Sequence, residues 1–393
     1  MKTNIPERIA ALREAMRQQK VDAYIIPSSD PHLSEYPADR WKSREWISGF
    51  TGSAGTIVVT ADKAGLWTDS RYFLQAASQL EGSGIELYKL ALPETPSITE
   101  FLLHELHAGQ AVGLDGQTYS AAEASALANK LSRKEIKLDT SADLIEGIWK
   151  DRPAVPGNPI FEMPEALSGA SVHEKLDLIN NQLRSEGADC LILAALDEIA
   201  WTFNIRGTDV TYNPVVVSYA FVSEDESVLF IKPEKLTAEI TEHLKKEGVT
   251  LAEYSMIQRY LSRLPENSRV FVDMNKTNVS LYDAIPGSCT IVEGISPANH
   301  LKSIKNETEI KGFQNAVVKD GVALTKFYIW LEKQMAEGAQ VTEISAAEKL
   351  TALRAEQPQY IMDSFGTICG YAEHGAIVHY SATPETDATL KPE

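Results

Sequence analysis

The chain repeats one order of secondary structure twice, and this internal duplication limits its fold more than any other feature of the sequence. In each copy an amphipathic helix leads to a short apolar strand, then to a turn containing glycine and to two further strands. The first strands follow Asp22 and Asp189, and the turns end at Gly52 and Gly207. The pattern therefore predicts two related α/β domains in tandem.

Two boundaries divide the chain into three parts. Residues 151–159 hold three prolines in nine residues, which is typical of a stiff linker between domains. After a second boundary within 291–305, Asn306 is placed to cap a long amphipathic helix whose first turn is acidic. We interpret the apolar stripe of this helix as ordinary core and not as a binding groove. We expect three domains, over residues 1–155, 156–303 and 304–393.

Composition excludes several classes of protein. With 37 basic and 55 acidic residues the net charge is −18, which argues against binding to nucleic acid. No apolar run approaches the length of about 18 residues that spans a membrane, and the N-terminus lacks the apolar core of a signal peptide. The three cysteines, Cys190, Cys289 and Cys369, are far apart and form no CxxC pair. We therefore expect a cytoplasmic protein with no disulfide, no zinc ribbon and neither nucleic acid nor a membrane as partner.

A histidine-containing stretch at residues 370–380 is the strongest candidate for chemistry. Ala376–Tyr380 is short, apolar and β-prone, so we predict a strand there, with Ile377 and His379 on the same face. An imidazole held on a buried strand suits proton transfer, because its ordinary pKa lies near neutrality. The alternative is a core or edge-strand histidine bonded to backbone. The residues alone leave both interpretations of His379 open.

Arg71 is the second candidate. It follows a predicted strand, and we expect it to open a helix that runs to Leu80. A cation in the first turn opposes the helix dipole. Arg71 therefore either pairs with a neighbour such as Asp69 or reaches toward an anionic ligand, and the sequence leaves both open.

Five motifs in order along the chain carry a family resemblance. They are Gly52-Ser53-Ala54-Gly55-Thr56, Trp67-Thr68-Asp69-Ser70-Arg71-Tyr72-Phe73, Leu196-Asp197-Glu198-Ile199-Ala200-Trp201, Asn204-Ile205-Arg206-Gly207 and Ala376-Ile377-Val378-His379-Tyr380. Together they resemble the large, three-domain Xaa-Pro aminopeptidases (aminopeptidase P) of the creatinase/prolidase-like pita-bread metallopeptidases. The resemblance covers essentially the whole chain. It implies two creatinase-N-like α/β domains with mixed sheets, followed by the first part of an α+β pita-bread domain. We interpret Glu198 and Arg206 mainly as structural.

The resemblance also implies an activity. Members of the family remove an N-terminal residue that precedes proline, using two divalent metal ions, typically manganese, that hold a bridging hydroxide. The histidine that matches His379 lies beside the metals, so His379 is implied to be catalytic and to contact substrate. Arg71 matches a position implicated in substrate binding, whereas no role transfers to His374. Proline-containing peptides are the implied partners, and a homodimer is expected for the complete protein.

The chain departs from the family in one important respect. The five metal ligands of the family are two aspartates, a histidine and two glutamates, and the sequence contains no Asp-Ser-Gly motif of the kind that carries the first aspartate. The resemblance places these ligands beyond Glu393, the last residue of the sequence. It therefore implies a C-terminally truncated chain, with no metal ligands, no bound metal and no activity on its own. The alternative is a non-catalytic homologue that uses the same domains as a scaffold for binding peptides or proteins.

Overall fold

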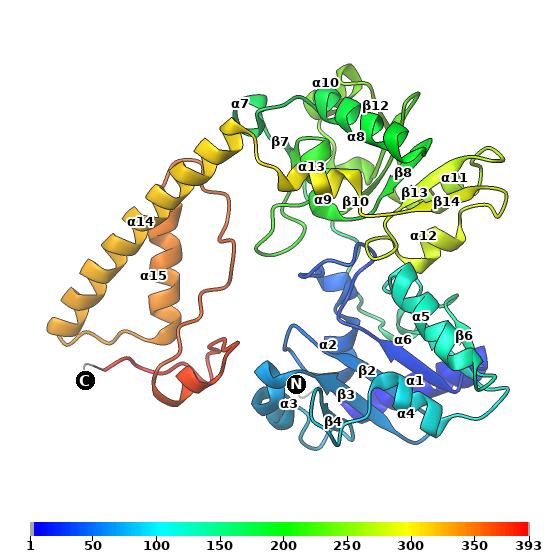
Figure 1. Ribbon diagram of the computed structural model, residues 1–393. Helices are drawn as coiled ribbons and strands as arrows, with labels where there is room; N and C mark the ends of the chain where they lie inside the picture. The colour runs from blue at the N-terminus through cyan, green and yellow to red at the C-terminus, as the bar shows by residue number, and fades with distance from the viewer. Residues whose placement is uncertain (1–3, 392–393) are drawn as a thin grey trace. The chain divides into compact units, whose positions relative to one another are not determined.

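The computed structural model describes residues 4–391, which form two compact units (Figure 1). One unit extends to Glu165 and includes Ala170–Thr211 and Val215–Ile304. The other includes Ala166–Gly169, Tyr212–Pro214 and the chain from Lys305 onward. Nearly all of the first unit consists of two α/β domains, which we call domain I and domain II in chain order.

Domain I is built on a six-stranded sheet in the order β4-β3-β2-β1-β5-β6. Its strands are β1 (Ala23–Ile26), β2 (Thr56–Thr60), β3 (Ala64–Thr68), β4 (Glu86–Lys89), β5 (Ala111–Leu114) and β6 (Lys137–Asp139). Its helices are α1 (Ile5–Gln19), α2 (Ser43–Ser48), α3 (Phe73–Gln79), α4 (Ile98–Glu105), α5 (Ala121–Ser132) and α6 (Leu144–Ile148). Strand β2 pairs antiparallel with both neighbours, and the remaining pairs are parallel. The sheet is therefore mixed, as predicted.

Both faces of this sheet are covered by helices, so the side chains of its central strands are buried on both faces. On one face Tyr24 and Ile26 pack in a cluster with Leu12 of α1. On the other face Ile25 packs in a cluster with Leu102 of α4. Four successive buried residues in β1 follow from this double covering, because side chains of a strand alternate between the two faces.

Domain II repeats this design, with the sheet order β12-β11-β10-β8-β13-β14. Its strands are β8 (Cys190–Leu193), β10 (Ser218–Ser223), β11 (Ser227–Ile231), β12 (Val249–Ala252), β13 (Arg269–Val272) and β14 (Thr290–Glu293), with a separate pair formed by β7 (Phe161–Glu162) and β9 (Ile205–Arg206). Its helices are α8 (Val172–Glu186), α9 (Leu196–Thr202), α10 (Ala238–Lys246), α11 (Ile257–Leu261), α12 (Val279–Asp283) and α13 (Pro297–Ser303). The short α7 (Glu165–Ser168), most of which belongs to the second unit, precedes α8. Each strand pair has the same sense as its counterpart in domain I. The duplication predicted from the sequence is thus confirmed.

A loop of domain I joins the two domains through an apolar contact. Ala38 and Trp41, which follow β1, are buried in one cluster with Leu196, Val215 and Val217 of domain II. Because this cluster draws on both domains, we infer that separating them would expose apolar surface to water.

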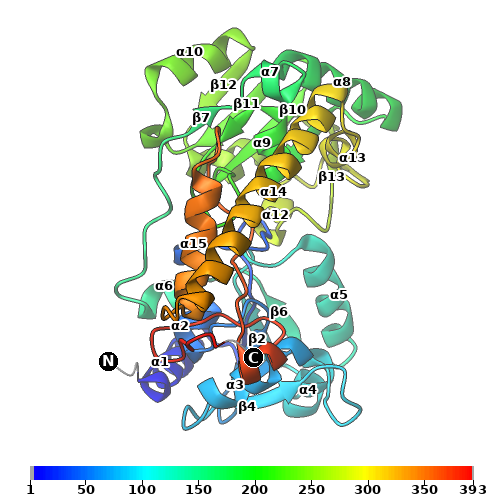
Figure 2. The same ribbon diagram turned by 90° about the vertical axis from the view of Figure 1, so that its left-hand side faces the viewer.

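The second unit contains one long helix and one shorter helix. Helix α14 (Glu307–Ala336) begins with the predicted cap, since Asn306 Oδ1 accepts from Glu309 N at 2.9 Å and Glu309 Oε2 accepts from Asn306 N at 2.9 Å. Helix α15 (Glu343–Ala355) runs back along α14 (Figures 1 and 2). The two helices are joined by an ion pair of 2.7 Å between Arg354 Nε and Asp320 Oδ1.

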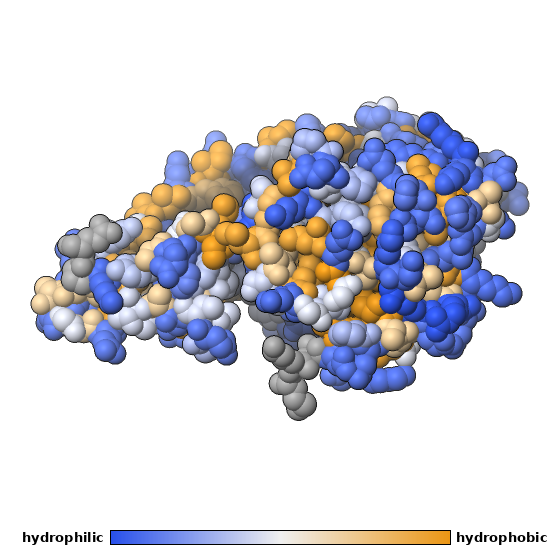
Figure 3. All heavy atoms as spheres, turned by 90° about the horizontal axis from the view of Figure 1, so that it is seen from below, coloured by the Kyte–Doolittle hydropathy of each residue, from blue (hydrophilic) through white to orange (hydrophobic). Residues whose placement is uncertain are grey.

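The prediction that the apolar stripe of α14 is ordinary core is wrong. Phe313 is 60% exposed and Val317 is 71% exposed, and Ala323 is the one buried residue of this helix. Packing against α15 covers only part of the helix surface, which explains the exposure. Figure 3 shows hydrophobic residues reaching the surface of the molecule on the face that it displays.

The strand predicted at Ala376–Tyr380 is also wrong. A short 3-10 helix (Ala372–Ala376) precedes a turn in its place, and between 305 and 391 the structure has no strand, only an isolated bridge between Thr342 and Thr389. The physical reason is that a strand needs a neighbour to accept and donate its backbone hydrogen bonds, which the described residues of this unit do not supply. Over residues 4–391, no helix has the length and apolar character needed to cross a membrane.

Candidate functional site

Arg71 lies just before helix α3, on a 3-10 turn (Ser70–Tyr72), and so does not open the helix itself as predicted. Its Nε donates to Asp69 Oδ1 and its Nη2 donates to Asp69 Oδ2, both at 2.8 Å, so the ion pair is bidentate. Asp69 also accepts from Arg71 N at 3.1 Å and so caps the turn. The hydrogen bonds to Asp69 raise the pKa of Arg71 above its ordinary value. The pairing interpretation is therefore confirmed, and the paired Arg71 side chain remains 41% exposed.

His379 lies in the turn that follows the 3-10 helix of the second unit, where it is half-buried. His379 belongs to the second unit, whereas Arg71 belongs to the first. Because His379 is not on a strand, the prediction that Ile377 and His379 share one face of a sheet does not apply. What orders the segment around His379 is a carboxylate that the sequence analysis did not single out.

That carboxylate belongs to Glu343, the first residue of α15, whose side chain is fully buried. Its oxygens accept from Tyr371 N at 2.6 Å, from His374 Nδ1 at 2.9 and 3.1 Å, from Tyr380 Oη at 2.8 Å and from Ala388 N at 3.2 Å. The rings of His374 and Tyr380 also stack, with centroids 4.5 Å apart. We call this set of five residues the Glu343 cluster.

Hydrogen bonds decide the charge state of Glu343. Burial alone would raise its pKa, but the bonds from Tyr371, His374, Tyr380 and Ala388 outweigh burial, so its pKa lies below the ordinary value. A carboxylate only accepts hydrogen bonds, and so Nδ1 of His374 must carry a hydrogen. Glu343 also sits at the start of a helix, where the helix dipole favours a negative charge. The result is a buried, ionised group that holds several donors at once.

No signal in the sequence marks this cluster. Glu343 and Tyr380 lie 37 residues apart, and an acidic residue in the first turn of a helix is common and has a local explanation. The two motif residues interpreted as structural do have structural contacts. Glu198 is buried and accepts from Asn299 Nδ2 at 3.2 Å, and Arg206 Nη1 donates to Ala200 O at 2.6 Å.

A two-metal centre does not fit the described residues. Over residues 4–391, no group of three or more histidine, cysteine, aspartate or glutamate side chains is arranged to hold a metal ion. A pair of divalent ions needs several such donors, two or more for each ion. The Glu343 cluster offers one carboxylate whose oxygens are already engaged, so it is no substitute.

The resemblance predicts that the metal ligands of the family follow Glu393. Glu393 lies outside the described residues, which end at residue 391. The expectation that the ligands follow Glu393 therefore stays a prediction, and so does the expectation of a truncated chain.

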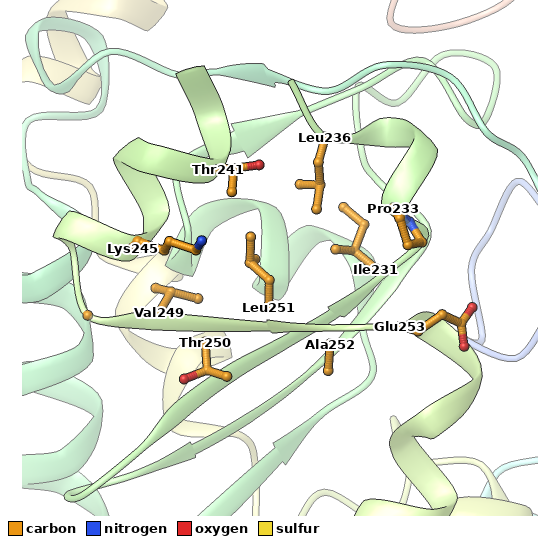
Figure 4. A pocket seen from close by; sticks show the side chains of 11 residues that line it. Ile231, Pro233, Leu236, Thr241, Lys245, Val249, Thr250, Leu251, Ala252 and Glu253 are labelled. Atoms are coloured by element: carbon orange, nitrogen blue, oxygen red, sulfur yellow. The ribbon is translucent and has the colours of Figure 1, made fainter. Parts of the chain in front are cut away.

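A surface hollow lies at one edge of the domain II sheet, between α10 and β12 (Figure 4). Its volume is about 630 Å³, and its floor is apolar, with Leu236, Val249 and Leu251 among the lining side chains. Lys245 and Glu253 are its charged residues. The lining contains no histidine or cysteine and none of the predicted site residues, so the hollow does not supply the groups of a hydrolytic centre.

The chain is similar to known proteins in both sequence and structure. Two family models, both described as the Creatinase/Prolidase N-terminal domain, match residues 8–148 and 151–309. The fold also superimposes on the crystal structure of X-prolyl aminopeptidase from Caenorhabditis elegans, described as a cytosolic enzyme with a di-nuclear active site, with a TM-score of 0.93 and 30% identity, covering 98% of this chain and 66% of that one. The chain is thus a tandem of creatinase/prolidase N-terminal domains followed by a further segment.

Curated relatives agree with this assignment. The probable Xaa-Pro aminopeptidase P of Coprinopsis cinerea is 38% identical over 401 residues, covering 98% of this chain and 64% of that protein. Aminopeptidase P2 of Arabidopsis thaliana is 36% identical over 426 residues, covering 100% of this chain and 60% of that protein. The chain belongs to the Xaa-Pro aminopeptidase (aminopeptidase P) family. It spans about 60–64% of the length of these two relatives.

Proposed function

We propose that the complete protein, meaning this chain together with the rest of the length found in its relatives, is an aminopeptidase that removes an N-terminal residue preceding proline. The observation that carries the proposal is the similarity to the C. elegans X-prolyl aminopeptidase, which extends over 98% of this chain at a TM-score of 0.93. The substrates would be peptides with proline at the second position. The domain division at 1–155, 156–303 and 304–393, with a pita-bread domain beginning in the last part, belongs to the same proposal.

His379 is proposed as the catalytic residue of this chain. The nitrogen of an Xaa-Pro bond carries no hydrogen, so it leaves readily only after it has been protonated. An imidazole beside this nitrogen can donate the proton near neutral pH, and its N–H can also stabilise charge that develops on the carbonyl oxygen. The same ring would contact the substrate.

Arg71 is proposed as a substrate-binding residue of domain I. Its ion pair with Asp69 uses Nε and Nη2, and it fixes the plane of the guanidinium. A guanidinium whose plane is fixed in advance loses little side-chain entropy when it binds a carbonyl or carboxylate of a peptide.

Two divalent metal ions, manganese by the resemblance, are proposed as cofactors of the complete protein. No residue among 4–391 is assigned to them, because no suitable cluster exists there, and their ligands are proposed to follow Glu393. We accordingly propose that the chain of residues 1–393 is inactive by itself. A homodimer and a cytoplasmic location are proposed for the complete protein; the C. elegans relative is a cytosolic enzyme.

The test compares the complete protein with the 393-residue chain on the peptide Arg-Pro-Pro. We expect the complete protein to release free arginine in the presence of Mn²⁺ and to leave Arg-Ala-Ala intact. Release from both peptides would contradict the proposed specificity. Binding of Arg-Pro-Pro without any cleavage would instead support the second candidate, a homologue that holds peptides as a scaffold.

A further inference from the structure

The Glu343 cluster ties together a segment that has little regular structure of its own. Apart from one 3-10 helix, residues 361–391 contain no helix or strand. Holding such a chain in one conformation has a cost in backbone entropy for every residue. The segment therefore needs interactions that fix it from outside, and Glu343 supplies them from the end of a regular helix.

The donors to Glu343 lie on both sides of His379 along the chain. Tyr371 and His374 come before it, and Tyr380 and Ala388 come after it. One side chain thus fixes the entry and the exit of the turn that carries His379. Tyr380 is the next residue along the chain and is itself buried, so its bond to Glu343 acts directly beside the histidine.

The strength of the cluster comes from the buried charge. Hydrogen bonds to a charged acceptor are stronger than bonds between neutral groups. Removing the charge would leave Tyr380 and the three partly buried donors without an adequate acceptor, and an unsatisfied buried group is destabilising. The segment would then lose its single conformation before the helices α14 and α15 lose theirs, because the two helices have contacts of their own.

We propose that Glu343 is the positioning residue for His379 in the aminopeptidase reaction. This inference rests on the proposed function, since it requires that His379 acts on the substrate. Glu343 does not touch the substrate; it holds the turn so that the imidazole meets the reacting bond in one orientation. Misplacement of a catalytic group by about 1 Å can lower the rate by about 100-fold.

The first experiment measures order in the 393-residue chain and needs no activity. Hydrogen exchange with mass spectrometry compares the wild type, E343Q and the control E348Q, whose side chain is exposed on the same helix. We expect E343Q to lower protection across 371–388 by about tenfold or more while domains I and II keep theirs, and E348Q to change neither. Unchanged protection in E343Q would overturn the proposal.

The second experiment measures turnover of Arg-Pro-Pro by the complete protein. E343Q is expected to lower kcat by about 10- to 100-fold and to change KM much less, because Arg71 on domain I keeps its place. Y380F, which removes a single donor, is expected to shift kcat in the same direction by a smaller factor. Should E343Q fail to fold, Y380F gives the same comparison on its own.

The third experiment combines E343Q with H379A. If Glu343 acts through His379, the double variant is no slower than H379A alone, because the two losses are not independent. Multiplied effects would show that Glu343 acts by another route and would overturn the proposal. A fully active H379A variant would instead contradict the proposed role of His379, whatever the hydrogen exchange of E343Q shows.

Discussion

Nε2 of His32 lies 2.9 Å from the hydroxyl group of Tyr254, so a loop of domain I is hydrogen-bonded to domain II. Nδ1 of the same ring lies 2.9 Å from Ala194 O. A carbonyl oxygen only accepts, so Nδ1 carries the hydrogen and Nε2 accepts from Tyr254. Burial lowers the pKa of His32, although the nearby carboxylate of Asp30 opposes the shift. His32 is therefore a neutral imidazole that bridges the two domains.

The first prediction concerns the pH dependence of stability. The unfolded chain binds a proton on His32 at its ordinary pKa of about 6.5, whereas the buried ring does not, so stability should fall as the pH drops from 7 to 5. H32N, which does not titrate, should flatten this part of the dependence, and H32A should lose about 2–4 kcal/mol at pH 7. Urea unfolding followed by circular dichroism measures both effects. H107N, at an exposed histidine, is the control, and an equal slope in wild type and H32N would contradict the prediction.

The second prediction separates the two roles of Arg71. Its ion pair with Asp69 is partly exposed, so R71A should change the stability of domain I by less than about 1 kcal/mol. In the complete protein R71A should raise KM by about tenfold with a smaller effect on kcat, because a hydrogen bond to a charged group contributes about 1.5–3 kcal/mol. Steady-state kinetics on Arg-Pro-Pro measures this. R184A removes a comparable exposed ion pair, with Glu224, and should leave KM unchanged. An unchanged KM in R71A would leave the ion pair as its only role.

The third prediction tests His379 directly. H379A in the complete protein should lower kcat by about two to four orders of magnitude, the usual contribution of a positioned proton donor or oxyanion group. Metal content should stay intact, since the resemblance does not place His379 among the metal ligands. Metal analysis accompanies the kinetics, and H107A is the matched control. Cleavage at close to the wild-type rate would remove His379 from the mechanism.

The fourth prediction concerns the thiols, all three of which are free, as the sequence predicted. Cys190 is buried, and burial raises its pKa to about 12. In the folded chain Cys289 and Cys369 should therefore react with iodoacetamide well before Cys190, because the thiolate is the reactive form. After unfolding without reductant, all three should be alkylated. Mass spectrometry of the peptides measures the alkylation of each cysteine. A pair of cysteine peptides linked by a disulfide would contradict the prediction.

Features with a local cause could be predicted from the sequence. The amphipathic helix and the short apolar strand predicted on either side of Asp22 are α1, whose buried face includes Leu12 and Met16, and β1, whose residues are all buried. The cap of α14 at Asn306 and the pairing of Arg71 with Asp69 involve residues no more than three positions apart. In each case the two residues that interact are close together in the sequence.

Features that depend on distant residues could not be predicted. A strand at Ala376–Tyr380 has suitable composition, but composition does not supply the neighbouring strand it needs. The stripe of α14 has the spacing of a core helix, yet burial depends on what packs against it, and Phe313 stays exposed. The carboxylate of Glu343 meets its donors 28 to 45 residues away, a relationship that no periodicity encodes.

The last prediction concerns the chain of 393 residues as it stands. It should bind no pair of metal ions tightly and should not cleave Arg-Pro-Pro, because no cluster of three donors exists among the described residues. Hydrogen exchange should show strong protection in domains I and II, which have buried cores of their own, and weaker protection after about residue 340, where the irregular segment 361–391 offers few buried contacts. Inductively coupled plasma mass spectrometry after dialysis against Mn²⁺ and then against metal-free buffer measures the metal, with the complete protein as the positive control. The contrary outcome is that the chain retains two manganese ions or releases arginine by itself. Either result would show that the metal ligands do not all follow Glu393, and that side chains from separate parts of residues 1–393 form the metal centre. The prediction would then be wrong.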